Sequence, residues 1–151
     1  MKITKIGPLG LQLIKDFEGF KSKPYLCPAN VPTIGYGSTR YVNGTKVTLA
    51  DKPLSEKEAE ALLMATLHTY EQAVDSYCSD EISQHQFDAL VSFCYNLGAG
   101  NLKSSTLLKK VNINPNDPTI ILEFLKWNRG GGIILKGLTL RRQAEATLYG
   151  S

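Results

Sequence analysis

Glu18, Cys27 and Thr33 are residues whose types and spacing could support a proton-transfer reaction. Glu18 ends an apolar, helix-like run, and a carboxyl group at a helix C-terminus faces the negative end of the helix dipole, which disfavours its charged form. A glutamic acid held in its neutral form can act as a proton donor. The alternative is a solvated carboxylate paired with Lys15 or Lys21, which contributes little. The residue types alone leave both interpretations open.

Cys27 follows Leu26 and precedes Pro28 in a loop-like stretch. The chain has neither a CxxC pair nor a histidine at ligand spacing, so we expect no zinc site and no other cofactor. A histidine distant in the sequence stays open as a partner for the Cys27 thiol. Thr33 could direct its hydroxyl into a site or pack its methyl group as an ordinary strand residue.

The remaining cysteines and the basic pair near the C-terminus are easier to interpret. Cys78 and Cys94 lie within apolar helical patterns, which predicts buried, unpaired thiols. Arg141 and Arg142 are adjacent on a predicted helix, so their side chains should point about 100° apart. We therefore expect one to face inward, where it would suit pairing with Glu18, and the other to be solvated.

Hydrophobic periodicity predicts a mostly helical α+β protein. From Pro24 to Val47 the pattern changes to short β-prone runs, "TIGYGSTRY" and "TKVTL", which predict a small antiparallel sheet of two or three strands. Asn43-Gly44, between these runs, is a strong hairpin-turn signal. Two sequences of the capping-box type open helices: Ser55 with Glu58, and Ser83 with Gln86. The expected helices cover residues 8–19, 55–77, 83–97, 105–111, 118–127 and 139–149. The glycines at 130–132 and 137 predict a mobile or tightly turned loop.

The chain of 151 residues, with 42% hydrophobic and 21% charged residues and a net charge of +3, is typical of one globular domain. Neither a membrane span nor a signal peptide is apparent, which predicts a protein made and kept in a cytoplasm. The sequence contains no phosphate-binding glycine motif, and we expect no nucleic acid partner. The helical stripes are accounted for by one core, which predicts a monomer.

Four separated motifs together resemble one family: "FEGF", then Cys27 and "TIGYG", then "QFDALVSFCYNLGAGNLKSSTLLKKVN", and finally Trp127 with "GGG" and "KGLTLRRQAEATLY". In order and spacing they are similar to the phage-type lysozymes, the endolysin family that includes the T-even phage muramidases (glycoside hydrolase family 24). The resemblance implies a single lysozyme domain over 1–151 with two lobes. Its expected parts are an N-terminal lobe with a small antiparallel sheet at about 20–54, an inter-lobe helix at 55–78, and a helical C-terminal lobe at 82–150 plus the first helix.

The resemblance also implies hydrolysis of the β-1,4 bond between N-acetylmuramic acid and N-acetylglucosamine in peptidoglycan. In this family a catalytic glutamate is followed after nine positions by Asp or Cys, and after six more by Thr; Glu18, Cys27 and Thr33 have this spacing. Glu18 would be the general acid, and Cys27 and Thr33 would activate or position water. A thiol is a suitable base if Lys21, Lys23 or Arg40 lowers its pKa; a covalent glycosyl-thiol is an alternative.

Other positions receive roles by the same resemblance. Tyr95 and Asn96 fall in the cleft-wall segment and would contact sugar, and Arg141 and Arg142 are further candidates for substrate binding. Ser38 departs from the T-even members, which carry a histidine there. The alternative functions are a lytic transglycosylase that gives a 1,6-anhydro product and a non-catalytic peptidoglycan-binding relative. The implied partners are peptidoglycan and a holin, without stable membrane association; the enzyme would wait in the host cytoplasm and act on the cell wall.

Overall fold

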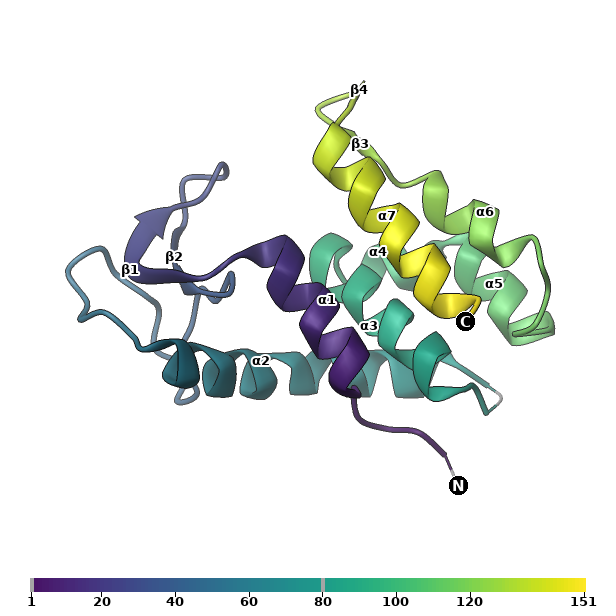
Figure 1. Ribbon diagram of the computed structural model, residues 1–151, viewed down its shortest axis with the longest axis horizontal. Coiled ribbons are helices and arrows are strands. Elements are labelled where there is room, and N and C mark those ends of the chain that lie inside the picture. The colour runs from purple at the N-terminus through teal and green to yellow at the C-terminus, as the bar shows by residue number, and fades with distance from the viewer. Residues whose placement is uncertain (1, 80) are drawn as a thin grey trace. The chain divides into compact units, whose positions relative to one another are not determined.

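The computed structural model describes residues 2–79 and 81–151, which divide into two compact units. One unit comprises Met1–Ile14 with Tyr70–Ser151, and the other is Lys15–Thr69; we call them the discontinuous unit and the continuous unit. Figure 1 labels the elements in chain order, with helices predominating over short strands. The mostly helical α+β class predicted from the sequence is confirmed. Among the described residues, no helix combines the length and the apolar character needed to cross a bilayer.

The continuous unit contains a two-stranded antiparallel ribbon. Strand β1 (Lys21–Leu26) pairs with β2 (Pro32–Gly35), and Tyr25 lies opposite Thr33. The ribbon begins at Lys21, earlier than the predicted start at Pro24. This start was not predicted because the sequence "KSKPYL" is poor in the residues that favour strands. The turn at Asn43-Gly44 is confirmed, since the Gly44 amide donates to the Tyr41 carbonyl at 2.9 Å. Its flanks form only an isolated bridge between Arg40 and Lys46, so the expected strand "TKVTL" is wrong.

The long helix α2 (Glu56–Tyr77) begins where the capping pattern predicted. The Ser55 amide donates to the Glu58 carboxylate at 3.0 Å, and the Glu58 amide donates to the Ser55 hydroxyl at 3.1 Å. These reciprocal bonds satisfy two amides that the first helical turn leaves without a carbonyl partner. In the continuous unit, Leu62 of this helix packs with Ile34 and Val47 to form a small core.

Helix α1 (Pro8–Glu18) receives its N-terminal cap from a residue far along the chain. The buried carboxylate of Asp88 accepts the Gly7 amide at 2.9 Å and the Gly10 amide at 3.2 Å. A negative group there also complements the positive end of the helix dipole. A Cβ atom at Gly10 would lie 2.5 Å from the Asp88 Cβ, so this position admits no side chain without a shift of the backbone.

The discontinuous unit is built around the buried helix α3 (Gln84–Leu97), whose Ser83–Gln86 capping box is confirmed. Helix α7 (Lys136–Tyr149) packs against α3, and α6 (Ile120–Leu125) packs against α7 (Figure 1). The remaining helices are α4 (Ala99–Ser104) and α5 (Thr106–Ile113). Phe93 anchors this core with edge-on contacts to Phe124 at 5.8 Å and to Trp127 at 5.5 Å.

Several predicted helix limits in this unit need correction. Gly98, at φ 95°, ends α3 as expected, but α4 starts directly after it. Helix α6 is shorter than the predicted 118–127, because Asp117 holds the Thr119 amide at 2.8 Å in a turn ahead of the helix. Helix α7 begins at Lys136 and therefore includes Gly137, which had been assigned to a loop.

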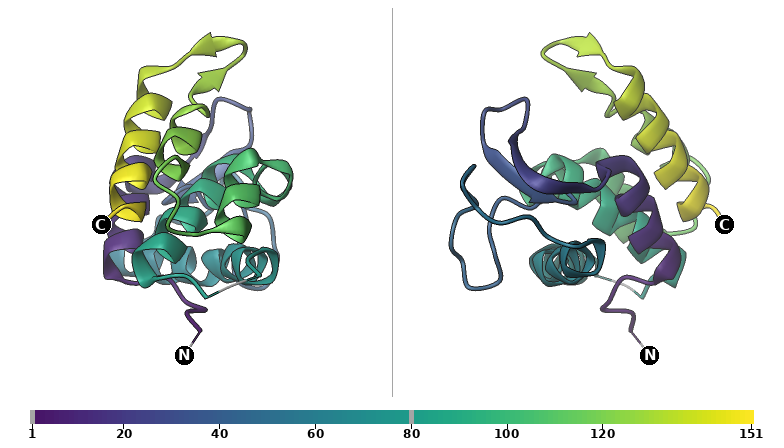
Figure 2. Two further views of the ribbon diagram at one scale, coloured as in Figure 1. Left: turned by 90° about the vertical axis from the view of Figure 1, so that its right-hand side faces the viewer. Right: turned by 60° about the vertical axis from the view of Figure 1, so that its left-hand side comes forward.

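Between α6 and α7 the chain forms a hairpin that was not predicted as strands. Strand β3 (Arg129–Gly130) pairs with β4 (Ile133–Ile134), and Gly131 and Gly132 connect them at φ 60° and 83°. Two successive positive φ angles are the geometry of a two-residue type I′ turn, which favours glycine. The tightly turned alternative for this glycine run is therefore correct. Figure 2 shows the hairpin extending beyond the ends of α6 and α7.

Candidate active site

The continuous unit holds Glu18, Cys27 and Thr33 together. Glu18 is the last residue of α1 and is partly exposed, and Gly19 ends the helix at φ 72°. Cys27 follows directly after β1 and is partly exposed, with a free thiol. Thr33 lies in β2 and is only 3% exposed. The acid thus comes from a helix end and the other two groups from one β-ribbon.

The loop that joins β1 to β2 bends around the Cys27 side chain. The Cys27 amide donates to the Val31 carbonyl at 3.1 Å, and the Asn30 amide donates to the Cys27 carbonyl at 2.8 Å. Asn30 closes the turn in the left-handed region at φ 62°, which asparagine tolerates better than most residues. This compact turn brings the backbone amides of Ala29 and Val31 to the sulfur of Cys27.

The pKa of the Cys27 thiol is lowered, chiefly by the hydrogen bond from the Val31 amide. Desolvation opposes this shift, and the Ala29 amide and the Thr33 hydroxyl add to it. Hydrogen bonds that favour the charged form are a recognised cause of such shifts. The lowered pKa that a suitable base requires is therefore present, and its largest contribution comes from a backbone amide rather than from Lys21, Lys23 or Arg40.

The Thr33 hydroxyl has two acceptors within reach but a single proton. It donates to the Val31 carbonyl at 2.9 Å, and it also forms a hydrogen bond to the Cys27 sulfur when that sulfur is charged. A hydroxyl can donate to only one of them at a time. Ionisation of Cys27 therefore favours a rotation of the Thr33 hydroxyl toward the sulfur. The buried position of Thr33 suits a residue that orients the thiol.

Tyr25 is a site residue that the sequence analysis did not identify. It lies directly opposite Thr33 in the ribbon, so the two side chains share one face. The pKa of the Tyr25 phenol is raised, first by burial, then by the charge of Glu18 and that of Cys27. The Lys21 ammonium lies 5.8 Å from the centre of its ring. The phenol is therefore electrostatically coupled to both proposed catalytic groups. Recognising the strand from Lys21 onward would have placed Tyr25 beside Thr33.

Arg141 and Arg142 belong to a buried ionic cluster in the discontinuous unit. The Arg142 Nε lies 2.7 Å from one Glu145 carboxylate oxygen, and the Arg141 Nε lies 3.5 Å from the other. The Ser92 hydroxyl donates to the same carboxylate. Both guanidinium groups and the carboxylate are buried, so the expectation that one arginine would be solvated is wrong. Burial raises the pKa of the Glu145 carboxyl, and the two guanidinium groups oppose this shift.

Two predicted sugar-contact residues lie at the C-terminal end of α3. Asn96 accepts a hydrogen bond from the Arg142 guanidinium at 2.9 Å, which occupies its amide oxygen. The partly exposed Tyr95 ring packs edge-on against Tyr70 at 5.2 Å between ring centres. The sugar contacts of both residues, like those of Arg141 and Arg142 and the pairing of an arginine with Glu18, stay predictions.

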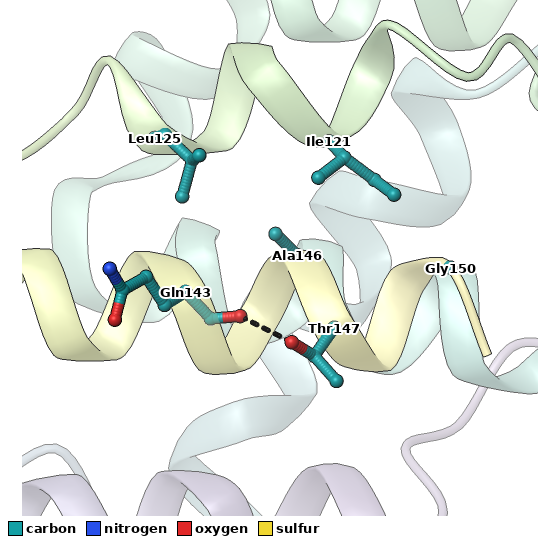
Figure 3. Close-up of a pocket in the computed structure, with 6 residues that line it drawn as sticks. All are labelled: Ile121, Leu125, Gln143, Ala146, Thr147 and Gly150. Carbon is teal, nitrogen blue, oxygen red and sulfur yellow. Dashed lines mark hydrogen bonds between the residues drawn. The ribbon is translucent and has the colours of Figure 1, made fainter.

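Other features of the described residues have a structural role. Cys78 and Cys94 are buried as predicted, and desolvation raises the pKa of each thiol to about 11. A shallow groove of about 300 Å³ lies between α6 and α7 (Figure 3), and its lining residues, all described, carry no acidic, basic or thiol side chain. No group of three or more His, Cys, Asp or Glu side chains within 2–79 and 81–151 could hold a metal ion.

The fold and the helix-end acid beside a β-ribbon define a protein of the lysozyme class. The Phage lysozyme family model matches residues 15–145. The chain is 42% identical over 144 residues to an endolysin of Bacillus phage B103, covering 95% of this chain and 53% of that protein. It is 35% identical to an endolysin of Acyrthosiphon pisum secondary endosymbiont phage 1, covering 97% of this chain and 98% of that protein.

Among solved structures, the endolysin from Escherichia coli O157:H7 phage FAHEc1 superposes with a TM-score of 0.88 at 33% identity, covering 96% of this chain and 92% of the other. The chain belongs to the phage lysozyme family. It spans about half the length of the endolysin of Bacillus phage B103 (53%), whereas it spans nearly all of the endosymbiont phage relative.

Proposed function

We propose that the chain is a muramidase that hydrolyses the β-1,4 bond between N-acetylmuramic acid and N-acetylglucosamine in peptidoglycan, in the service of host cell lysis. One observation supports this proposal most directly. The continuous unit combines the Glu18 carboxyl group with a Cys27 thiol whose pKa is lowered by backbone amides. An acid together with a group able to accept a proton is what glycoside hydrolysis requires.

In this mechanism the Glu18 carboxyl donates a proton to the glycosidic oxygen as the bond breaks, because the unprotonated oxygen is a poor leaving group. The Cys27 thiolate accepts a proton from a water molecule that attacks the sugar carbon, so the thiol ends protonated and Glu18 ends ionised. The Thr33 hydroxyl orients the sulfur through the hydrogen bond that forms when the thiol ionises. A nucleophilic role for Cys27 is the competing assignment; it would leave the sugar covalently attached to sulfur before water releases it.

Substitution of the acid tests the central assignment. We expect Glu18→Gln to lower the rate of peptidoglycan hydrolysis by about a hundredfold or more, because amide nitrogen cannot replace the proton donor. Asp16→Asn, on the same helix, serves as the matched control and should keep the activity. Retained hydrolysis in Glu18→Gln, with an unchanged circular dichroism spectrum, would remove Glu18 from the mechanism. Binding of the wild type to peptidoglycan without hydrolysis would instead favour a non-catalytic glycan-binding protein.

The product distinguishes hydrolysis from transglycosylation. Mass spectrometry of digested peptidoglycan should give muropeptides with a reducing end, whereas a lytic transglycosylase gives a 1,6-anhydro product that is lighter by one water. Cys27→Asp should keep the hydrolytic product, since a carboxylate is a competent base, and Cys27→Ser should lose much of the rate. A covalent sugar–enzyme adduct trapped in the wild type would instead support the nucleophilic assignment.

The route to the wall is a further part of this proposal. We propose that the monomeric protein accumulates in the host cytoplasm and that a holin releases it to the cell wall. Expression in a bacterium without a holin should then leave the cells intact, and co-expression of a phage holin should lyse them. Lysis without the holin would contradict this route, and a dimer in analytical ultracentrifugation would contradict the monomer.

A further inference from the structure

The β3–β4 hairpin exposes aliphatic side chains at its tip. Ile133 is 63% exposed and Ile134 is 59% exposed, and the neighbouring Leu135 is exposed as well. Scattered apolar residues on a surface are ordinary, but adjacent ones on a projecting element form a local apolar patch. We call Arg129–Lys136 the hairpin tip.

The pairing of the hairpin explains why nothing covers these two isoleucines. Successive side chains along a strand point to opposite faces of a ribbon, so the side chains of Ile133 and Ile134 lie on opposite faces of the hairpin. Ile133 lies opposite Gly130, which has no side chain to cover it, and Ile134 lies opposite the exposed Arg129. Leu135 differs, because its Cδ1 lies close against Gly130. These two isoleucine side chains therefore gain little burial from the folded hairpin.

The charged residues that flank the hairpin tip in the sequence all have one sign. Residues 124–144 contain five Lys or Arg and no Asp or Glu. Arg141 and Arg142 are buried, and Lys126 pairs with Glu123 at 3.0 Å. Arg129 and Lys136 remain exposed on either side of the isoleucines, and the Arg129 guanidinium donates only to the Gly132 carbonyl, at 3.3 Å, among the described contacts.

We propose that the hairpin tip binds the surface of a membrane that contains anionic lipids. Arg129 and Lys136 match the negative headgroups, while Ile133 and Ile134 enter the boundary between headgroups and acyl chains. An anionic glycan would satisfy the two cations but would leave the isoleucines in water. The contact is peripheral and reversible, which distinguishes it from stable anchoring, and it does not depend on the bond that the enzyme cleaves.

Vesicle flotation with the full chain tests this proposal. We expect binding to vesicles of phosphatidylglycerol and phosphatidylcholine, weaker binding to phosphatidylcholine alone, and loss of binding at high salt. Ile133→Ser/Ile134→Ser should weaken the binding by about tenfold or more, because two aliphatic side chains no longer leave water. Lys136→Gln should weaken it by about fivefold, the expected effect of one cation near an anionic surface.

Ile113→Ser/Leu122→Ser is the matched control, since these side chains are 84% and 57% exposed elsewhere on the same unit. This control should bind vesicles as the wild type does. Absence of vesicle binding in the wild type, or equal binding in the hairpin and control variants, would overturn the proposal. Hydrolysis of membrane-free peptidoglycan tests whether the hairpin tip binds glycan instead of lipid. If the hairpin variant loses this activity but keeps vesicle binding, the hairpin tip contacts glycan rather than lipid.

Discussion

At the scale of single residues, the ionisation of Cys27 depends on a backbone amide. Val31→Pro removes the amide that contributes most to the lowered pKa, so we expect the pKa of Cys27 to rise and its alkylation to require higher pH. Val31→Ala keeps the amide and is the matched control. The pH dependence of carbamidomethylation at Cys27, followed by mass spectrometry, measures the effect; identical profiles for the two variants would refute the role of this amide.

Tyr25 offers a test of the position of Glu18. The charge of the Glu18 carboxylate raises the pKa of the Tyr25 phenol because it disfavours a second negative charge nearby. We therefore expect Glu18→Gln to lower the pKa of Tyr25 toward its ordinary value, and Asp16→Asn to leave it unchanged. NMR titration of tyrosine ring carbons would follow each ring separately. An unchanged Tyr25 titration in Glu18→Gln would mean that these two groups are not coupled.

The site could be predicted from the sequence only in part. Glu18, Cys27 and Thr33 were found through their spacing, because their chemistry depends on side-chain type. The effect of Val31 could not be found in this way, since every residue except proline has an amide and only the turn at Asn30 directs this one to the sulfur. Glu145 follows Arg141 and Arg142 by four and three positions on the same helix, so helical spacing alone could have paired them. The burial of these three groups could not be predicted in this way, because it depends on the packing of α7 against α3.

At the scale of elements, the N-terminal caps contribute to the stability of the helices. Ser83→Ala removes the hydroxyl that accepts the Gln86 amide at 3.1 Å, so we expect a loss of about 1 kcal/mol in the free energy of unfolding. Ser76→Ala, within α2, removes a hydroxyl that bonds only to the preceding turn and should change stability much less. Urea denaturation of both variants measures the difference, and equal stabilities would contradict the capping role.

The fold was predicted best where local side chains determine an element. Both capping boxes gave the correct starts of α2 and α3, since their hydrogen bonds join residues three apart. The start of strand β1 was missed because pairing with β2, rather than its own composition, stabilises "KSKPYL". Helix α4 was missed because Gly98 and Gly100 indicate a helix end, which is correct for α3 but hides the start of the next helix.

At the scale of the whole molecule, we expect the buried ionic cluster to be costly to disturb. Glu145→Ala would leave Arg141 and Arg142 buried without their shared carboxylate, and we expect a loss of about 3 to 5 kcal/mol in the free energy of unfolding. Glu123→Ala is the matched control on the same unit: its partners Lys110 and Lys126 keep 29% and 66% side-chain exposure and can be hydrated. Its loss should be clearly smaller in urea unfolding. Equal losses would show that burial of the two arginines does not increase the cost of removing their carboxylate partner.

The cap of α1 has a consequence for the point during synthesis at which this helix can form. Helix α1 has 11 residues, and an isolated helix of that length is marginal in water. The carboxylate that holds its first turn belongs to Asp88, 78 positions beyond Gly10. During synthesis α1 therefore lacks its cap until much of α3 has left the ribosome. Over that interval we expect the N-terminal segment of the nascent chain not to hold a stable helix. In a truncated chain that ends before Asp88, the α1 amides should therefore be weakly protected from hydrogen exchange.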